Sequence, residues 1–183
     1  MDAAVEVFAV RGIANSSVND IAHAAGLTKG ALYSNFGSKD ELILAIMEER
    51  LVARTLDGIA AFEAQQQLEP ALTNLGSVLM GAIHTDGTWQ HLLVEYCGMA
   101  RRDESMRLGL RHRRREGRLA VTRAIERASA AYDLKLQITP TEFAVTLMAL
   151  SNGLALEAGI DPEAVPDDLF GRVLALIGAP PAE

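Results

Sequence analysis

Residues 17–36 carry side chains that can donate hydrogen bonds to phosphate groups or to the edges of bases. Lys29 can reach a guanine edge or a phosphate, and Tyr33 and Ser34 can donate to phosphates or to bases. Gly30 and Ala31 lie between them and are small enough to allow close approach to a groove. The chemistry that these residue types predict is contact with double-stranded DNA.

Three further residues lie where helix N-termini are predicted. Free backbone N–H groups at a helix N-terminus favour phosphate, so Ser17, Thr28 and Lys39 are candidates for contact with the DNA backbone. Helix capping is the alternative role for Ser17 and Thr28, and the two roles can coexist. The candidate DNA-binding residues are therefore Ser17, Thr28, Lys29, Gly30, Ala31, Tyr33, Ser34 and Lys39.

A helix-turn-helix would position these side chains, because it locks two short helices at a fixed angle around a small core. Ala22 supplies the small residue where the helices cross, and Gly26 supplies the turn. The residues expected to face inward are Val18, Ile21, Ala25, Leu27 and Leu32. A first helix over residues 2–10 precedes this pair, and the sequence 38–41 predicts the start of a long fourth helix.

The rest of the chain also shows helical patterning. Prolines lie at boundaries, no stretch shows sustained two-residue alternation, and residues 139–142 form a strong helix start signal. We therefore predict an all-α fold with about nine helices. A three-helix DNA-binding head would occupy residues 1–45, and a larger helical ligand-binding and dimerisation domain would occupy residues 46–183.

Residues 1–50 resemble the N-terminal domain of TetR-family (tetracycline-repressor-like) transcriptional regulators. The resemblance is carried by Phe8 and Gly12, by residues 17–22 and 25–33, and by Phe36 with residues 38–42. It implies a homodimer that binds a palindromic operator, usually as a repressor released by a small molecule. It also implies that residues 29–31, 33 and 34 read the operator. Histidines are frequent in the family at the positions of Ser34 and Asn35, so no operator preference carries over.

The charge of the chain is low for a DNA-binding protein. The formal net charge is −7 at pH 7, and residues 1–50 hold four basic against seven acidic side chains. DNA-binding proteins usually present a basic surface. Lys29 and Lys39 flank the predicted reading helix, and a short basic arm upstream of Met1 is the hypothesis that would supply the missing charge.

The family layout implies that the closing helices, 140–159 and 166–177, form a dimer interface. The residues proposed for it are Phe143, Leu147, Leu150, Leu154, Leu169 and Val173. Periodicity leaves open whether they face a partner or the core of their own subunit. The helices between Pro70 and Tyr132 would enclose a small hydrophobic or aromatic effector.

The residues proposed for the effector site are Met80, His84, Trp89, Tyr96 and Met99, with ordinary core packing as the alternative. The arginine-rich run 111–115 fits a solvated helix or, alternatively, contact with an anionic effector such as an acyl-coenzyme A.

Several classes of function find no support in the sequence. No nucleophile–base set, metal-ligand spacing or phosphate-binding loop suggests an enzyme, a metal site or a cofactor. No apolar run is expected to approach the roughly 18 residues of a membrane helix, so no membrane partner is predicted. The single Cys97 and the lack of a signal-peptide layout predict a cytoplasmic protein. The alternative to a ligand-responsive repressor is a constitutive DNA-binding regulator, or an activator, without an effector.

Overall fold

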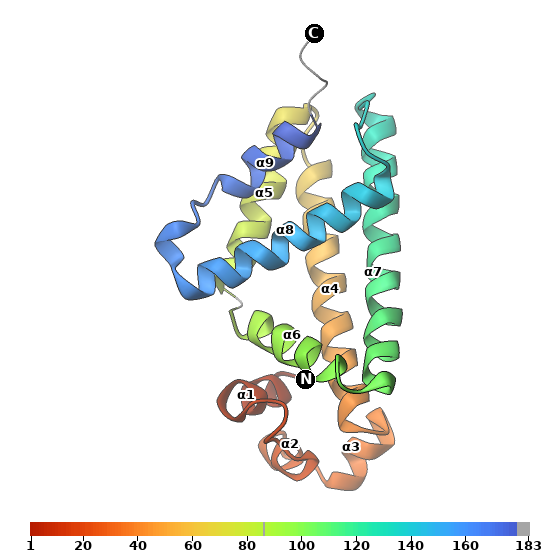
Figure 1. Cartoon of the computed structure of the whole chain (residues 1–183), viewed down its shortest axis with the longest axis vertical. Helices are drawn as coiled ribbons and strands as arrows, with labels where there is room; N and C mark the ends of the chain where they lie inside the picture. The colour runs from red at the N-terminus through yellow and green to blue at the C-terminus, as the bar shows by residue number, and fades with distance from the viewer. Residues whose placement is uncertain (86, 179–183) are drawn as a thin grey trace. The chain divides into compact units, whose positions relative to one another are not determined.

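The computed structural model of the chain describes residues 1–85 and 87–178, without the side chains of residues 51, 87–89 and 177–178. Within these residues the regular elements are nine α-helices and one 3-10 turn, with no strand, which confirms the predicted all-α fold (Figure 1). The chain forms two compact units. The first unit joins Met1–Arg50 with Thr88–Arg114, and the second joins Leu51–Gly87 with Arg115–Glu183. The predicted boundary at residue 45 stays a prediction.

The first unit begins with three short helices, α1 (Asp2–Arg11), α2 (Val18–Ala24) and α3 (Lys29–Phe36). Glycines in the left-handed region end the outer two and make the turn: Gly12 (φ +77°) follows α1, Gly26 (φ +65°) lies between α2 and α3, and Gly37 (φ +68°) follows α3. Residues other than glycine rarely adopt these backbone angles, so the three glycines define where the helices stop.

The remaining helices of the first unit are the N-terminal parts of α4 (Lys39–Glu63) and α7 (Glu104–Ala131) and most of α6 (Gly87–Ala100). Ser38 caps α4, since its hydroxyl accepts a hydrogen bond from the backbone N–H of Glu41 at 3.0 Å. Asp103 caps α7 by accepting from the backbone N–H groups of Ser105 and Met106. Helix α6 buries its apolar face in the same core as the three short helices. That core includes Phe8, Ile13, Ile21, Leu32, Leu42, Ile46, Leu92, Leu93 and Tyr96.

Two residues predicted to face inward do not. Ile21 and Leu32 are buried and Val18 packs partly against the core, as expected. Ala25 and Leu27 are exposed, and Leu27 retains 50% of its accessible surface. Ala25 is the C-cap of α2 and Leu27 precedes Thr28, the N-cap of α3, so both residues lie in the turn around Gly26 and not on the inward face of either helix.

The second unit is organised around α5 (Leu68–Thr85), α8 (Pro140–Ile160) and α9 (Leu169–Gly178), with a 3-10 turn at Pro162–Ala164. Helix α9 packs along α5, and the two backbones meet at a pair of glycines (Figure 1). A Cβ atom on Gly76 would lie 2.5 Å from the Cα of Gly171. The core beside this crossing includes Leu72, Met80, Ile83, Ala155, Phe170 and Leu174.

Hydrogen bonds fix the C-terminal ends of α4 and α7 within the second unit. The hydroxyl of Tyr132 donates to the carbonyl oxygen of Gln65 at 2.6 Å, and its ring makes an edge-to-face contact with Phe62 at 5.3 Å between centroids. The side-chain amide of Asn74 on α5 donates to the carbonyl oxygen of Ala61 at 2.6 Å. These contacts hold α5 and the end of α7 against the end of α4.

Helix α8 corrects the expectation about apolar runs. It is 21 residues long, and an 18-residue window within it has a mean hydropathy of 1.5, so its length and composition would suffice to cross a membrane. Only 17% of that window is buried. The small residues Thr146, Ser151 and Gly153 interrupt the apolar run without lowering its mean hydropathy much. Helix α8 therefore presents more apolar surface than its own unit covers.

Candidate nucleic-acid interface

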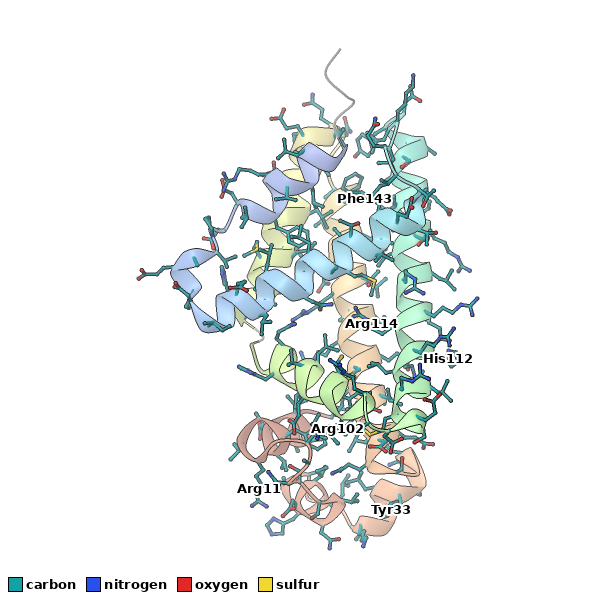
Figure 2. All side chains as sticks on the ribbon, viewed as in Figure 1. Arg11, Tyr33, Arg102, His112, Arg114 and Phe143 are labelled. Atoms are coloured by element: carbon teal, nitrogen blue, oxygen red, sulfur yellow. The ribbon has the colours of Figure 1, made fainter. Side chains whose placement is uncertain are left out.

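Helix α3 exposes a polar face, and its opposite face packs in the core of the first unit. Leu32 is 4% exposed and packs in the core of the first unit, whereas Lys29, Gly30, Tyr33 and Ser34 are exposed. Figure 2 labels Tyr33 on this helix. The ammonium group of Lys29 lies 5.8 Å from the centroid of the Tyr33 ring, within range of a cation–π attraction. The two largest polar side chains of this face are therefore neighbours.

The hydroxyl groups of Thr28 and Ser34 differ in the hydrogen bonds that they form within the protein. Thr28 caps the helix by accepting from the backbone N–H of Ala31 at 3.1 Å, which leaves its own O–H free to donate. Ser34 donates to the carbonyl oxygen of Ala31 at 2.9 Å, which leaves its oxygen free to accept. A free donor suits a phosphate and a free acceptor suits an amino group of a base. Ala31 itself is half-buried.

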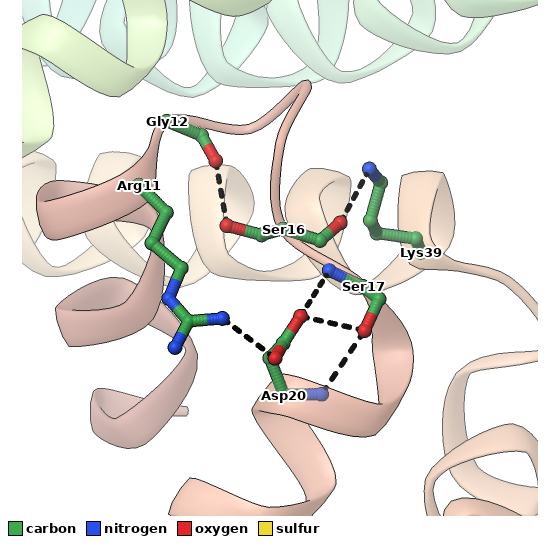
Figure 3. A network of polar contacts seen from close by, with 6 residues as sticks. All are labelled: Arg11, Gly12, Ser16, Ser17, Asp20 and Lys39. Atoms are coloured by element: carbon green, nitrogen blue, oxygen red, sulfur yellow. Dashed lines mark hydrogen bonds and ion pairs between the residues drawn. The ribbon is translucent and has the colours of Figure 1, made fainter.

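Ser17 closes a capping box at the start of α2 (Figure 3). Its hydroxyl donates to the Asp20 carboxylate at 2.6 Å and accepts from the backbone N–H of Asp20 at 3.2 Å. The carboxylate also accepts from the backbone N–H of Ser17 and from the guanidinium of Arg11 at 2.6 Å. The Ser17 hydrogen bonds, assisted by the charge of Arg11, lower the pKa of Asp20. The polar atoms of Ser17 are thus used within the protein, and its contact with phosphate stays a prediction.

Lys39 also has partners within the protein. Its ammonium group donates to the carbonyl oxygen of Ile13 at 2.8 Å. It also donates to the carbonyl oxygen of Ser16 at 2.9 Å (Figure 3). An ammonium has three donors, so one N–H remains for another acceptor. Lys39 is therefore a structural clamp on the loop between α1 and α2, and its contact with phosphate stays a prediction.

Sequence reasoning missed two features of this unit. Leu27 is exposed directly before Thr28, the N-cap of α3, so an apolar side chain is accessible near the start of this helix; its position directly after the turn glycine was the available signal. The second is the balance of charge. Residues 88–114 belong to the same unit and hold six arginines against three acidic residues. The first unit as a whole has ten basic and ten acidic side chains, so its formal charge is zero.

The residues proposed for the effector site are divided between two cores. Met80 is 1% exposed in the core of the second unit, and His84 is exposed with its Nδ1 3.3 Å from a carboxylate oxygen of Asp167. Tyr96 is fully buried in the core of the first unit. Met99 is partly buried and packs against the same core. The Trp89 side chain lies outside the described residues. Their binding of an effector stays a prediction.

The environment of Tyr96 is unfavourable for ionisation. Burial, with smaller contributions from the negative charges of Asp40 and Asp103, raises its pKa to about 12. Its hydroxyl has no hydrogen-bond partner among the described residues. Tyr96 therefore acts as an apolar core residue in this structure.

The residues proposed for the dimer interface face mainly inward. Leu169 and the α8 residues Phe143, Leu147, Leu150 and Leu154 pack partly against the core of their own unit, and Val173 is half-buried. A different set of α8 residues is exposed at intervals of three or four positions. We call this set the α8 stripe; it comprises Val145, Ala149, Gly153, Leu156 and Ile160. Ile160 retains 72% of its accessible surface, and a Cβ atom on Gly153 would have open space around it.

Comparison with known proteins places the head in a family. Residues 1–46 match the family model described as bacterial regulatory proteins, tetR family. Over 115 residues, 62% of this chain, the sequence is 31% identical to two proteins of Pseudomonas putida: the HTH-type transcriptional regulator SrpR and the uncharacterised HTH-type transcriptional regulator TtgW. The match spans about half of SrpR (49%) but 78% of TtgW.

The fold also matches a solved structure. The transcriptional regulator FadR from Bacillus subtilis, in complex with stearoyl-CoA, has a TM-score of 0.75 at 16% identity over 97% of this chain and 95% of its own. The matched head model and the extent of the match to TtgW show that this chain belongs to the TetR family of bacterial transcriptional regulators.

Proposed function

We propose that the chain is a DNA-binding transcriptional regulator that binds a palindromic operator as a homodimer and represses until a small molecule releases it. The observation that carries this proposal is the exposed polar face of α3 on a firmly anchored helix-turn-helix. Lys29 and Tyr33 would supply the main contacts, since both are exposed and lie side by side.

The face of α3 suits the major groove for physical reasons. Gly30 has no side chain, so the helix backbone can approach the base edges closely. The ring of Tyr33 would restrict the motion of the Lys29 side chain, so less conformational entropy is lost when its ammonium group binds a guanine edge or a phosphate. The free O–H of Thr28 would donate to a phosphate at the N-terminus of α3.

The proposal requires a dimer, because two-fold symmetric regulators read palindromic sites, one half-site per subunit. The α8 stripe is an exposed apolar surface of the kind that a second subunit covers. We propose that two copies of the chain associate through the α8 stripe.

The effector is proposed to be a small hydrophobic or aromatic molecule. The structural relative FadR was solved in complex with stearoyl-CoA, whose acyl chain is apolar and whose coenzyme A part is anionic, so it supports an apolar binding region for this fold and also the anionic alternative. Stearoyl-CoA and a panel of small aromatic compounds can be tested by thermal unfolding. An effector present at about 100 times its Kd stabilises the protein by about 2.7 kcal/mol. It should also weaken DNA binding; a ligand that stabilises the protein without weakening DNA binding would favour the constitutive alternative.

The reading face can be tested by mutation after a duplex has been selected from a random pool. Lys29→Ala or Tyr33→Ala should each weaken binding of the selected duplex by about 1–3 kcal/mol, because each removes a base or phosphate contact. Tyr33→Phe keeps the ring and separates its effect from that of the hydroxyl. Binding would be measured by fluorescence anisotropy at several salt concentrations.

The matched control for Lys29→Ala is Lys135→Ala, which removes an exposed lysine of the second unit. It should leave the affinity unchanged. Wild-type affinity in both Lys29→Ala and Tyr33→Ala would mean that another face of the head contacts DNA. If the wild-type protein enriched no duplex at all, the proposed function would be wrong.

A further inference from the structure

A carboxylate from α6 binds the loop between α1 and α2. Glu95 accepts a hydrogen bond from the backbone N–H of Ile13 at 2.9 Å and another from that of Ala14 at 3.1 Å. Ile13 and Ala14 lie 82 and 81 positions before Glu95 in the sequence, but all three residues belong to the first unit. One carboxylate thus satisfies two successive amides that no helix can satisfy.

A side chain from α4 donates hydrogen bonds to the carbonyl groups of the same loop. Lys39 donates to the carbonyl oxygens of Ile13 and Ser16. The hydroxyl of Ser16 in turn donates to the carbonyl oxygen of Gly12 at 2.6 Å. Side chains from two other helices therefore satisfy the N–H and C=O groups of this short connection. Ile13 is fully buried between them, so the loop has little freedom to move.

Glu95 approaches the loop closely at Gly12. A Cβ atom on Gly12 would lie 3.2 Å from a carboxylate oxygen of Glu95, and Gly12 has a φ of +77°. Any other residue at this position would be strained and crowded against the carboxylate. The loop conformation and the Glu95 contact thus depend on each other.

The loop leads directly into the helix-turn-helix, since Ser17 caps α2 immediately after it. Its conformation sets the direction in which α2 leaves α1, and α3 follows α2 after a turn at Gly26. We propose that Glu95 is a positioning residue for DNA binding. It fixes the α1–α2 loop through the amides of Ile13 and Ala14, so that α3 is presented at the angle that the operator requires. This inference rests on the proposed function.

Glu95→Ala tests the role because it removes both acceptors and leaves the apolar face of α6 intact. Exchange of the Ile13 and Ala14 amide protons, followed by NMR, should accelerate by about tenfold or more. The affinity for the selected duplex should fall by about tenfold, while the amides of the core helices keep their protection. Glu95→Gln keeps one carbonyl acceptor and should restore part of the affinity.

The control is His91→Ala, which changes an exposed residue one turn earlier on α6 and should leave both measurements unchanged. If Glu95→Ala exposed the two amides yet bound the duplex like the wild type, the inference would fail while the proposed function stood. Loss of protection throughout the protein, with no rescue by Glu95→Gln, would indicate a purely structural role and would also overturn it. A wild-type protein that enriches no duplex would instead reject the proposed function.

Discussion

Gly76→Ala is expected to destabilise the protein by about 2–3 kcal/mol, although alanine is the better helix former. The new Cβ would lie 2.5 Å from the Cα and 2.6 Å from the backbone nitrogen of Gly171. Side-chain rotation cannot relieve a clash with backbone, so α5 and α9 would have to separate. Their separation would loosen the packing of Phe170 and Leu174, both of which are fully buried.

The matched control is Gly81→Ala on the same helix, where a new Cβ would meet no atom within 4 Å. That change should stabilise the helix by up to about 1 kcal/mol. Thermal and urea unfolding, at one fixed protein concentration, would measure both variants. Equal stability of Gly76→Ala and the wild type would show that α5 and α9 do not cross this closely in solution.

Leu156→Asp, alone or with Ile160→Asp, is expected to convert a dimer into monomers. The α8 stripe contains no charged residue, so an aspartate within it would be buried against the second subunit without a partner. We expect the dimer dissociation constant to rise by about 100-fold or more, which corresponds to about 3 kcal/mol. Affinity for a palindromic duplex should fall with it, since a monomer contacts only one half-site.

Sedimentation velocity over a range of concentrations would measure this dissociation. Leu119→Asp provides the control, because Leu119 is a leucine of comparable exposure (48% against 42% for Leu156) on α7 in the same unit. It should leave the dimer intact. A wild-type protein that sediments as a monomer, or a Leu156→Asp variant that stays dimeric, would mean that the α8 stripe is not a dimer interface.

Local chemistry explains why the sequence predicted the helix starts well. Ser17, Thr28 and Thr139 each cap a helix through a hydrogen bond to a residue three positions later, so neighbours in the sequence determine the contact. The same is true of the turn at Gly26, which depends on its own backbone angle. Contacts of this range can be inferred without knowing the tertiary structure.

Contacts between distant segments could not be predicted in this way. Nothing in the sequence near Glu95 indicates that its carboxylate binds backbone amides more than eighty residues away. Apolar residues cover nearly all faces of α8, so periodicity could not separate the inward Leu147 from the exposed Leu156. The size and amphipathic character of Tyr96 predict either a ligand contact or core packing, and only the tertiary structure shows that the side chain is buried in the core of the first unit.

The neutral charge of the first unit has a consequence for how an operator would be found on a chromosome. Attraction between basic side chains and the phosphate backbone dominates binding to random DNA, and it is the force that keeps a protein sliding along the duplex. A first unit with as many acidic as basic side chains would have little of this attraction. Such a protein would search for its operator mainly by free diffusion, and few of its molecules would be bound to the millions of non-specific sites in a genome. Its occupancy of the true site would then be set by how well α3 fits the groove.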